Sequence, residues 1–261
     1  MGILNVTPDS FSDGGRFTDE TAMTRQAEAL IAAGADIIDI GGESSRPFAE
    51  DVPLAEELAR VLPAVRAVRR LDAAIPVSID TTKAEVARQA LAAGASIIND
   101  ISALRFDPAM AEVAAQHQVP VILMHMQGTP RDMQLEPTYQ DVIAEIMAFL
   151  TERIDWAMQR GIHRENLIVD PGIGFGKSVE HNLSIIKHLG RFRELGCPVL
   201  IGHSRKAFIG RLLDLTVEDR DIPTAILAAI CALAGAAIIR VHDVAHTRAA
   251  VRLAQALRMA P

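Results

Sequence analysis

The sequence predicts a (β/α)8 barrel, the α/β fold also called a TIM barrel, in which eight parallel strands alternate with helices and close into a ring. Three observations favour it. Eight short runs of Ile, Val and Leu alternate with stretches of helical periodicity. Polar residues follow nearly every run, and the 261 residues match the usual length of one barrel. We therefore expect residues 1–261 to form a single domain with its active site at the C-terminal ends of the strands; a doubly wound open sheet is the alternative.

The expected strands are almost continuous apolar runs, because parallel strands in such folds are covered on both faces. They span residues 2–6, 35–41, 75–80, 96–100, 119–125, 166–170, 198–202 and 237–242. Amphipathic segments between them predict helices, among them residues 21–33, 54–70, 83–93 and 141–160.

A weak internal repeat supports the barrel. Residues 33–39, 93–99 and 234–240 all read Ala-Gly-Ala-x-Ile-Ile followed by a polar residue. In each segment the glycine ends a helical pattern and a strand follows, as expected of a glycine just past a helix. The glycines lie 60 and 141 residues apart, which fits two and four βα units of about 30 to 35 residues.

Composition excludes several classes of partner. A net charge of −7 argues against a general nucleic-acid binder. Cys197 and Cys231 lie in apolar segments without a C-x-x-C pair, so we expect buried free thiols and neither a zinc site nor a disulfide. The first residues show no export signal, which predicts a cytoplasmic protein. The charge-free segment 222–239 is just long enough for a membrane span, but we interpret it as a buried helix followed by a buried strand, with no membrane partner.

The polar residues that follow the strands should surround one mouth, because all C-terminal strand ends of a barrel lie on the same side. They are Asn5, Thr7, Glu43, Ser44, Ser45, Arg46, Asp80, Asn99, Asp100, His125, Asp170, His203, Ser204, Arg205, Lys206, Arg240 and His242. Any one of them can merely cap the next helix. So many at one rim predict an active site.

Part of this set suits a phosphate-containing ligand. Arg46, Arg240 and His242 can hold a di- or tri-anionic group, helped by hydroxyls and helix N-termini. Asn5 offers a neutral oxygen, which fits Mg²⁺ shared with a diphosphate better than it fits an all-protein metal cage.

Another part suits a flat heterocycle. Asp80, Asn99 and Asp170 supply acceptors and an amide for ring N–H groups, since a carboxylate accepts two parallel N–H bonds. Lys206 can donate to a ring carbonyl, and Phe175 or the Lys206 stem can cover an aromatic face.

Three local patterns imitate other sites without fitting them. Residues 176–178 (GKS) end like a P-loop, but position 171 is Pro where the motif needs Gly. Residues 172–176 lack the final spacing of a dinucleotide-binding glycine motif. His242 and His246 have zinc-peptidase spacing, but the first should lie at a strand end and the second on a helix.

These motifs resemble those of the dihydropteroate synthase family. Residues 2–15 (GILNVTPDSFSDGG) and 41–47 (GGESSRP) are similar to its two signatures. The remaining motifs follow in the family's order over nearly the whole chain: 78–81 (SIDT), 97–100 (IIND), 123–128 (LMHMQG), 170–177 (DPGIGFGK), 204–206 (SRK) and 240–243 (RVHD).

The resemblance implies an enzyme of folate synthesis, a transferase that joins 6-hydroxymethyl-7,8-dihydropterin pyrophosphate to 4-aminobenzoate and releases pyrophosphate, with Mg²⁺ on Asn5 and a homodimer formed through late-barrel helices. It implies a pterin site of Asp80, Asn99, Asp170 and Lys206, a pyrophosphate site of Ser45, Arg46, Arg240 and His242, and an aminobenzoate site, also the sulfonamide site, of Phe11, Pro47, Phe175 and Lys206. The catalytic groups among these would be Asp80, Lys206, Arg240 and His242.

The chain departs from the family pattern at three positions. Ser45 stands where Thr is usual, Phe48 where Gly is common, and Ala207 where many members have Ser. Two alternatives remain: a methyltetrahydrofolate–corrinoid methyltransferase, which shares the barrel and the acidic pterin pocket, and a catalytically idle pterin-binding paralogue. The groups suited to pyrophosphate favour the synthase.

Overall fold

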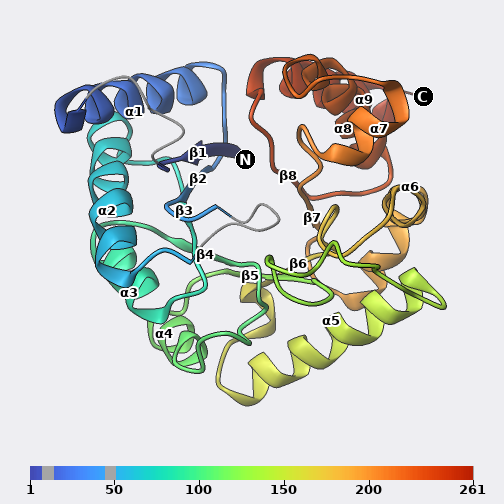
Figure 1. The fold of residues 1–261 in the computed structure, drawn as a ribbon, viewed down its shortest axis with the longest axis horizontal. Coiled ribbons are helices and arrows are strands. Elements are labelled where there is room, and N and C mark those ends of the chain that lie inside the picture. The colour runs from blue at the N-terminus through green and yellow to red at the C-terminus, as the bar shows by residue number, and fades with distance from the viewer. Residues whose placement is uncertain (8–14, 45–50, 261) are drawn as a thin grey trace.

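The computed structural model describes residues 1–7, 15–44 and 51–260, except the side chains of 15–19. In this part of the chain strands and α-helices alternate, except that two α-helices stand between the last two strands. The strands are β1 (Gly2–Asn5), β2 (Ile38–Gly41), β3 (Val77–Asp80), β4 (Ile97–Asp100), β5 (Val121–Met124), β6 (Leu167–Asp170), β7 (Leu200–Ile201) and β8 (Ile238–Ile239). The α-helices are α1 (Gly15–Ala32), α2 (Leu54–Leu71), α3 (Ala84–Ala92), α4 (Met110–His117), α5 (Val142–Gln159), α6 (Val179–Lys187), α7 (Ala207–Leu213), α8 (Asp221–Leu233) and α9 (Val244–Met259). Figure 1 shows the strands in the centre and the helices around them.

The strands close into a ring. β1 to β6 form one parallel sheet in chain order, and β7 pairs with β8. A bridge between Val169 and Val199 joins β6 to β7, and a bridge between Gly2 and Val241 joins β8 back to β1. At this second seam the Ile3 N–H donates to the Val241 carbonyl at 2.9 Å. The barrel prediction is confirmed, and the open-sheet alternative is wrong.

Several strands are shorter than their apolar runs, and proline explains three of them. Pro76, Pro120 and Pro198 stand directly before or near the starts of β3, β5 and β7, and each accepts a hydrogen bond through its carbonyl from the neighbouring strand. Proline has no N–H to give to the next rung of the ladder. Paired strand therefore begins only after these residues, although the apolar run begins earlier.

The repeated glycines do what the sequence predicts of them. Gly34, Gly94 and Gly235 follow α1, α3 and α8 with φ of 85°, 114° and 98°. This left-handed conformation favours glycine because a Cβ would clash. The glycines precede β2, β4 and β8, so they stand two and four βα units apart as expected.

The buried apolar residues described form three clusters, one of which consists of Met124, Met126, Met133 and Phe175 with Ile101 against it. The other two differ in size. The larger one fills the layer between strands and helices. A smaller cluster closes the inside of the barrel near the strand starts and consists of Ile97, Ile122, Ile168 and Leu200, with Met1, Ile37 and Ile238 against it. Side chains two residues apart share a strand face, so Asn99, Asp170 and Arg240 point inward above this plug. The barrel is thus apolar below and polar at its mouth.

The segment 222–239 is a helix and a strand as predicted, but only one face of the helix is buried and the strand is half-buried. Ile222, Ile226, Ile230 and Leu233 of α8 keep 47 to 57% of their surface exposed. Their spacing places them on one face of the helix, and that face is directed outward. Among the described residues, the helices include none with the length and apolar character that a membrane crossing needs. Cys197 and Cys231 are buried free thiols, as expected.

Candidate active site

Four strand ends lie side by side at the mouth. The strand register pairs Asn5 with Gly41, Gly41 with Asp80, and Asp80 with Asn99. The side-chain oxygens of Asn5 and Asp80 both lie close to Gly41. A Cβ on Gly41 would be 3.7 Å from Asn5 Oδ1 and 3.7 Å from Asp80 Oδ2. The sequence prediction that these residues share one rim is confirmed.

Arg240 binds two carboxylates at the centre of the mouth. Its Nε donates to Asp39 Oδ2 at 2.6 Å, and its Nη2 donates to Asp80 Oδ2 at 2.7 Å. Asp39 is fully buried in β2, and the Asn99 amide nitrogen lies 3.3 and 3.4 Å from its two oxygens. The guanidinium thus joins β2, β3 and β8 across the barrel.

Asp39 is a site residue that sequence reasoning missed, although a signal existed. It interrupts the apolar run of β2, and it lies two residues before the end of the strand. Period-two alternation therefore puts its side chain on the same inward face as Gly41. A carboxylate buried inside a barrel requires a cation, and Arg240 supplies it.

In this cluster each charged group stabilises the charged form of its partner. Burial raises the pKa of Asp80, while the adjacent Arg240 lowers it. Burial alone disfavours charge on Arg240, but Asp39 and Asp80 more than offset this, so the pKa of the guanidinium is raised. The mouth therefore contains a permanently charged arginine whose attraction opposes protonation of Asp80.

Lys206 stands at the start of α7 and reaches toward the 170–177 loop. Its Nζ donates to the Ile173 carbonyl and lies 4.3 Å from the centre of the Phe175 ring. Gly174 has a φ of 79°, and a Cβ there would lie only 2.8 Å from Lys206 Cδ. Glycine is therefore required at 174 both for the turn and for the lysine stem.

Burial lowers the pKa of Lys206 to about 7, and the carboxylate of Asp170 acts in the opposite direction. Burial also raises the pKa of Asp170, whose Oδ1 accepts the Gly172 N–H at 2.7 Å. A Cβ on Gly202 would meet the Arg240 side chain at 3.8 Å and Asp170 Oδ2 at 4.0 Å. Asp170, Lys206 and Arg240 thus face one region of the mouth.

His242 joins the same rim through Ser204. The Ser204 hydroxyl lies 2.9 Å from His242 Nδ1, and the His242 N–H donates to the same oxygen at 3.1 Å. His242 precedes α9 and His246 lies within it, so the two do not form a helical zinc pair, as the sequence predicts.

Arg205 of the predicted rim turns away from it toward the Asp221 carboxylate, and three further polar residues turn away as well. The Asp100 carboxylate accepts the Ser102 and Leu104 N–H groups, the Nδ1 of His125 lies 3.0 Å from the buried Lys177 amine, and the Nε2 of His203 lies 3.0 Å from the Thr224 carbonyl. Each of the three follows an inward-facing residue by one position, so alternation directs it outward. Their assignment to the mouth was wrong, and they hold loops instead.

Five predicted or notable positions lie outside the described residues: Phe11, Ser45, Arg46, Pro47 and Phe48. Asn5 does lie at the mouth, at the end of β1. The described residues contain no group of three or more His, Cys, Asp or Glu able to hold a metal ion. A single amide oxygen fits Mg²⁺ that keeps water and phosphate oxygens as its other ligands.

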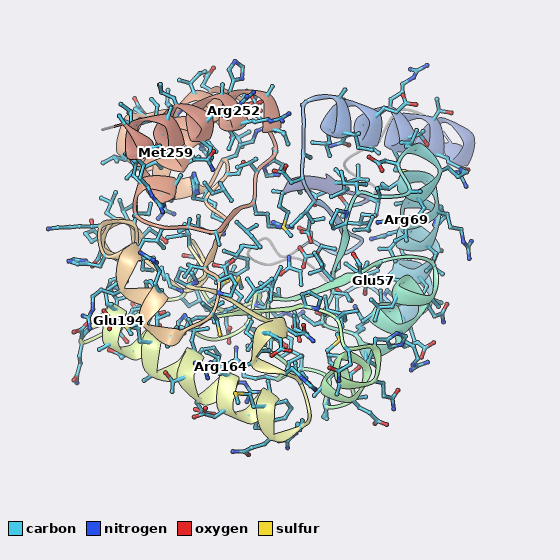
Figure 2. The ribbon with its side chains drawn as sticks, turned by 180° about the vertical axis from the view of Figure 1, so that it is seen from behind. Glu57, Arg69, Arg164, Glu194, Arg252 and Met259 are labelled. Atoms are coloured by element: carbon cyan, nitrogen blue, oxygen red, sulfur yellow. The ribbon has the colours of Figure 1, made fainter. Side chains whose placement is uncertain are left out.

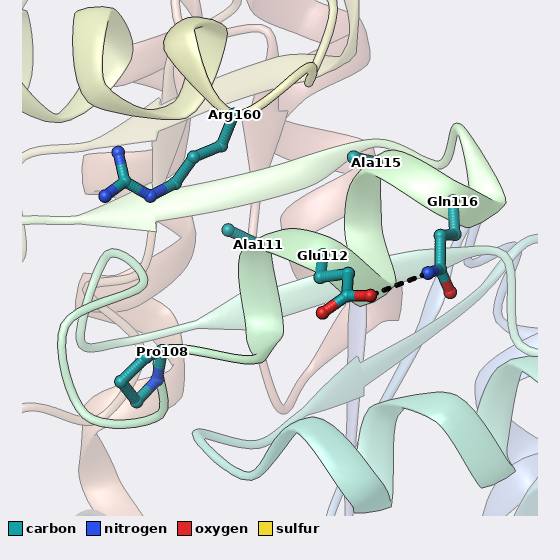
Figure 3. Close-up of a pocket in the computed structure, with 6 residues that line it drawn as sticks. All are labelled: Pro108, Ala111, Glu112, Ala115, Gln116 and Arg160. Atoms are coloured by element: carbon teal, nitrogen blue, oxygen red, sulfur yellow. Dashed lines mark hydrogen bonds between the residues drawn. The ribbon is translucent and has the colours of Figure 1, made fainter.

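A surface pocket lies elsewhere, on the outer ring of helices (Figure 3). It has a volume of about 390 Å³ and is lined by Pro108, Ala111, Glu112, Ala115, Gln116 and Arg160. Glu112 and Gln116 are hydrogen bonded to each other at 3.0 Å. None of the strand-end residues lines it, so the mouth and not this pocket is the candidate active site.

Comparison with known proteins places the chain in a family. The model of the pterin binding enzyme family matches residues 1–242. A dihydropteroate synthase of Synechocystis is 48% identical over 259 residues, covering 98% of this chain and 89% of the relative. The Escherichia coli K12 dihydropteroate synthase is 48% identical over 257 residues, covering 98% and 90%. The chain belongs to the dihydropteroate synthase family.

Solved structures of dihydropteroate synthases share the fold of this one. A Yersinia pestis dihydropteroate synthase, solved with a sulfonamide drug complex, has a TM-score of 0.94 at 44% identity and covers 99% of this chain and 94% of that one. The enzyme of Xanthomonas albilineans in complex with 7,8-dihydropteroate has a TM-score of 0.90 at 45% identity, covering 100% and 93%.

Proposed function

We propose that the barrel mouth carries out the dihydropteroate synthase reaction, joining 6-hydroxymethyl-7,8-dihydropterin pyrophosphate to 4-aminobenzoate. One observation carries this proposal. Asp80, Asp170, Lys206 and Arg240 converge at the mouth of a barrel that belongs to this family. Such a set offers acceptors for a heterocycle and cations for a diphosphate in one place.

The pterin ring is held by the acidic side of the mouth. Asp80, Asn99 and Asp170 accept or exchange hydrogen bonds with the ring N–H groups, and Lys206 donates to the ring carbonyl. When a ligand fills the mouth, these polar groups lose their hydrogen bonds to water. The N–H groups of a pterin ring replace those hydrogen bonds and an apolar ring does not, so the site favours the pterin.

The pyrophosphate is held by Arg240 and His242 with Ser45 and Arg46. Arg240 uses Nε and one Nη for Asp39 and Asp80, and a guanidinium has five N–H donors, so others remain for phosphate oxygens. Asp39 keeps Arg240 oriented. Asn5 holds Mg²⁺, which supplies further neutralisation of the charge on the departing pyrophosphate.

In the reaction, the bond between the pterin methylene carbon and the pyrophosphate oxygen breaks, and the amine nitrogen of 4-aminobenzoate forms a bond to that carbon. The electron pair of the broken bond leaves on pyrophosphate, and the amine gives up one proton, which the departing pyrophosphate takes up. The Asp80 carboxylate stabilises positive charge at the methylene. Arg240, His242 and Arg46 stabilise the negative charge on the leaving group, so no covalent enzyme intermediate is needed.

The aminobenzoate lies against Phe175 and the Lys206 stem, with Phe11 and Pro47 completing its site. Lys206 Nζ already lies 4.3 Å from the centre of the Phe175 ring. Ala207 is the first residue of α7, so the helix N-terminus offers N–H groups to a carboxylate there even without a serine hydroxyl.

A pyrophosphate-release assay tests the proposal. Purified protein with Mg²⁺, the pterin pyrophosphate and 4-aminobenzoate should release pyrophosphate and form dihydropteroate, and removal of Mg²⁺ with EDTA should stop the release until Mg²⁺ is restored. Tight pterin binding without release, in the presence of an active control enzyme, would identify the idle paralogue instead. Release that is unaffected by EDTA would remove the metal from the proposal.

We also propose that the chain forms a homodimer through its last three helices. α7, α8 and α9 lie together on one side of the barrel (Figure 1), and Met259 lies near the end of α9 (Figure 2). Their exposed large apolar residues are Leu212, Leu213, Ile222, Ile226, Ile230, Leu233, Leu253, Leu257 and Met259. Apolar surface gathered on one side of a protein marks an interaction site, and a second copy of the chain offers the same surface in return.

Replacing Ile226 by Asp is expected to convert the dimer to a monomer, because the substitution puts a charge into the apolar centre of the contact. Light scattering after size-exclusion chromatography measures the mass. Met158→Asp on α5, at a side chain 41% exposed, is the matched control and should remain dimeric. A wild-type protein that is monomeric at micromolar concentration would refute the interface.

We propose a cytoplasmic location for this enzyme as well. Cys197 and Cys231 are both unpaired thiols, which suits a reducing compartment.

A further inference from the structure

In the short loop between β7 and α7, successive side chains make contacts in turn with α8 and with the mouth. Ser204 contacts His242, and Lys206 reaches Ile173, both at the mouth. His203 and Arg205 instead contact the start of α8, through Thr224 and Asp221. Every second residue of this loop therefore serves the site, and the residues between them bind α8.

Arg205 adopts a backbone conformation that α8 maintains. Its φ is 55°, in the left-handed region that residues with a Cβ seldom adopt. Its N–H donates to Thr224 Oγ1 at 3.1 Å, and its carbonyl accepts from Arg220 Nη1 at 3.1 Å. Its guanidinium donates twice to the Asp221 carboxylate, at 2.6 and 2.7 Å. Such a conformation persists only where surrounding contacts determine it.

Arg220 can reach under α7 only because Gly210 has no side chain. A Cβ on Gly210 would lie 2.3 Å from Arg220 Nη2. The same guanidinium also donates to the Leu215 carbonyl at 3.0 Å. The segment 220–224 is therefore packed closely enough against α7 to serve as a rigid support for the loop.

Lys206 is the N-cap of α7, and its carbonyl accepts the Ile209 N–H at 3.1 Å. Its N–H donates to the His203 carbonyl at 3.3 Å, a long bond. The left-handed conformation of Arg205 therefore fixes the path of the chain into Lys206, while the Ile173 carbonyl holds the far end of the side chain. We propose that the Arg205–Asp221 ion pair is a positioning device that aims Lys206 at the pterin site, so that the two residues act on substrate binding without touching substrate. This inference rests on the proposed function.

A partly exposed ion pair contributes little to the stability of a whole protein, and Arg205 and Asp221 keep 37% and 24% of their side chains exposed. A displaced catalytic group, in contrast, can cost up to about a hundredfold in rate. The pair should therefore matter much more for substrate binding than for folding.

The test uses Arg205→Asn, Asp221→Asn and the double variant. Asn tolerates the left-handed conformation better than most residues, so the first variant removes the ion pair without new strain. We expect the KM for the pterin pyrophosphate to rise about tenfold, with kcat at saturation changed less than about threefold. The double variant should be no worse than either single one, because both remove the same interaction.

The matched control is Arg88→Asn, which breaks the exposed Arg88–Glu85 pair on α3 and should leave KM unchanged. A destabilised protein would show a lower kcat at an unchanged KM, because fewer molecules are active. That result, or an unchanged KM in both single variants, would overturn the proposal.

A second measurement works without substrate and so separates this inference from the proposed function. Lys206 faces Asp170, Arg240 and Asp80, and acetylation of each lysine by acetic anhydride is followed by peptide mass spectrometry as a function of pH. In the wild type the midpoint for Lys206 should lie near 7. In Arg205→Asn it should move up by at least about one unit, as the amine leaves its buried place. An unchanged midpoint would refute the positioning role even if the enzyme were inactive.

Discussion

Replacing Lys206 by Ala is expected to abolish detectable pterin binding and to lower kcat/KM about a thousandfold. Lys206 faces the carboxylates of Asp170 and Asp80 in the mouth and donates a hydrogen bond there. Removal of one partner from a desolvated, hydrogen-bonded charge pair costs about 2 to 5 kcal/mol of binding energy, and about 4 kcal/mol is a thousandfold.

Isothermal titration with a pterin and steady-state kinetics measure the two effects of Lys206→Ala. The control is Lys187→Ala, which removes an exposed lysine from α6 and should change neither. Full pterin affinity in Lys206→Ala would contradict the assignment of this lysine to the pterin site.

The free energy of unfolding of Lys206→Ala should be at least as large as that of the wild type, and the difference between the two should depend on pH. Lys206 has a pKa of about 7 in the folded protein, whereas the pKa of a solvent-exposed lysine is 10.5. Between these two pH values the unfolded chain therefore binds more protons than the folded one. The unfavourable contribution of Lys206 is therefore fully present below pH 7 and is lost as pH rises toward 10.5. Urea unfolding of both proteins at pH 7 and pH 9.5 should show the advantage of Lys206→Ala shrinking with pH. An advantage that grows with pH would contradict the lowered pKa.

Replacing Arg240 by Met should reduce the free energy of unfolding by about 3 to 5 kcal/mol at pH 8, the typical effect of removing one partner of a buried ion pair. Arg240 binds Asp39 and Asp80 at 2.6 and 2.7 Å, and Asp39 is fully buried. Without the guanidinium, Asp39 and Asp80 would lie inside the barrel without the cation that now binds both of them. Activity should also be lost, because the pyrophosphate site loses its permanent charge.

This destabilisation should become smaller at lower pH. Burial raises the pKa of Asp80 and Arg240 opposes that effect, so without Arg240 the carboxyl takes up a proton at a higher pH. The folded variant would then bind more protons than its unfolded chain, and its stability would fall as pH rises. Urea unfolding at pH 5.5 and pH 8 tests this. Adding Asp39→Asn should restore part of the stability at pH 8, and an equal loss at both pH values would argue against the charge explanation.

Much of the fold was predictable because its determinants are local. Apolar runs of strand length, helical periodicity and the glycines at 34, 94 and 235 each act within a few residues. The same holds for the placement of Asp80, Asn99, Asp170 and Arg240 at the mouth, since each lies within one residue of the end of a strand.

Strand alternation explains which residues near the strand ends do not face the mouth. Asp100, His125 and His203 were predicted to face the mouth, yet each follows an inward residue and turns outward to hold a loop. Asp39 was omitted for the converse reason, since it lies inside a strand and still points inward. A period-two count along each strand corrects all four.

By itself, the sequence determined the number and order of the strands, the mouth at the strand ends and the residue types gathered there, because periodicity, turn preference and strand direction are properties of short segments. Only the tertiary structure decided which of those side chains are partners. Arg240 meets Asp39 across 201 residues and Asp80 across 160, and Arg205 meets Asp221 across 16. These groups meet because the strands close into a ring. A local sequence pattern does not determine such a pairing, since it depends on how distant strands are arranged around the barrel axis.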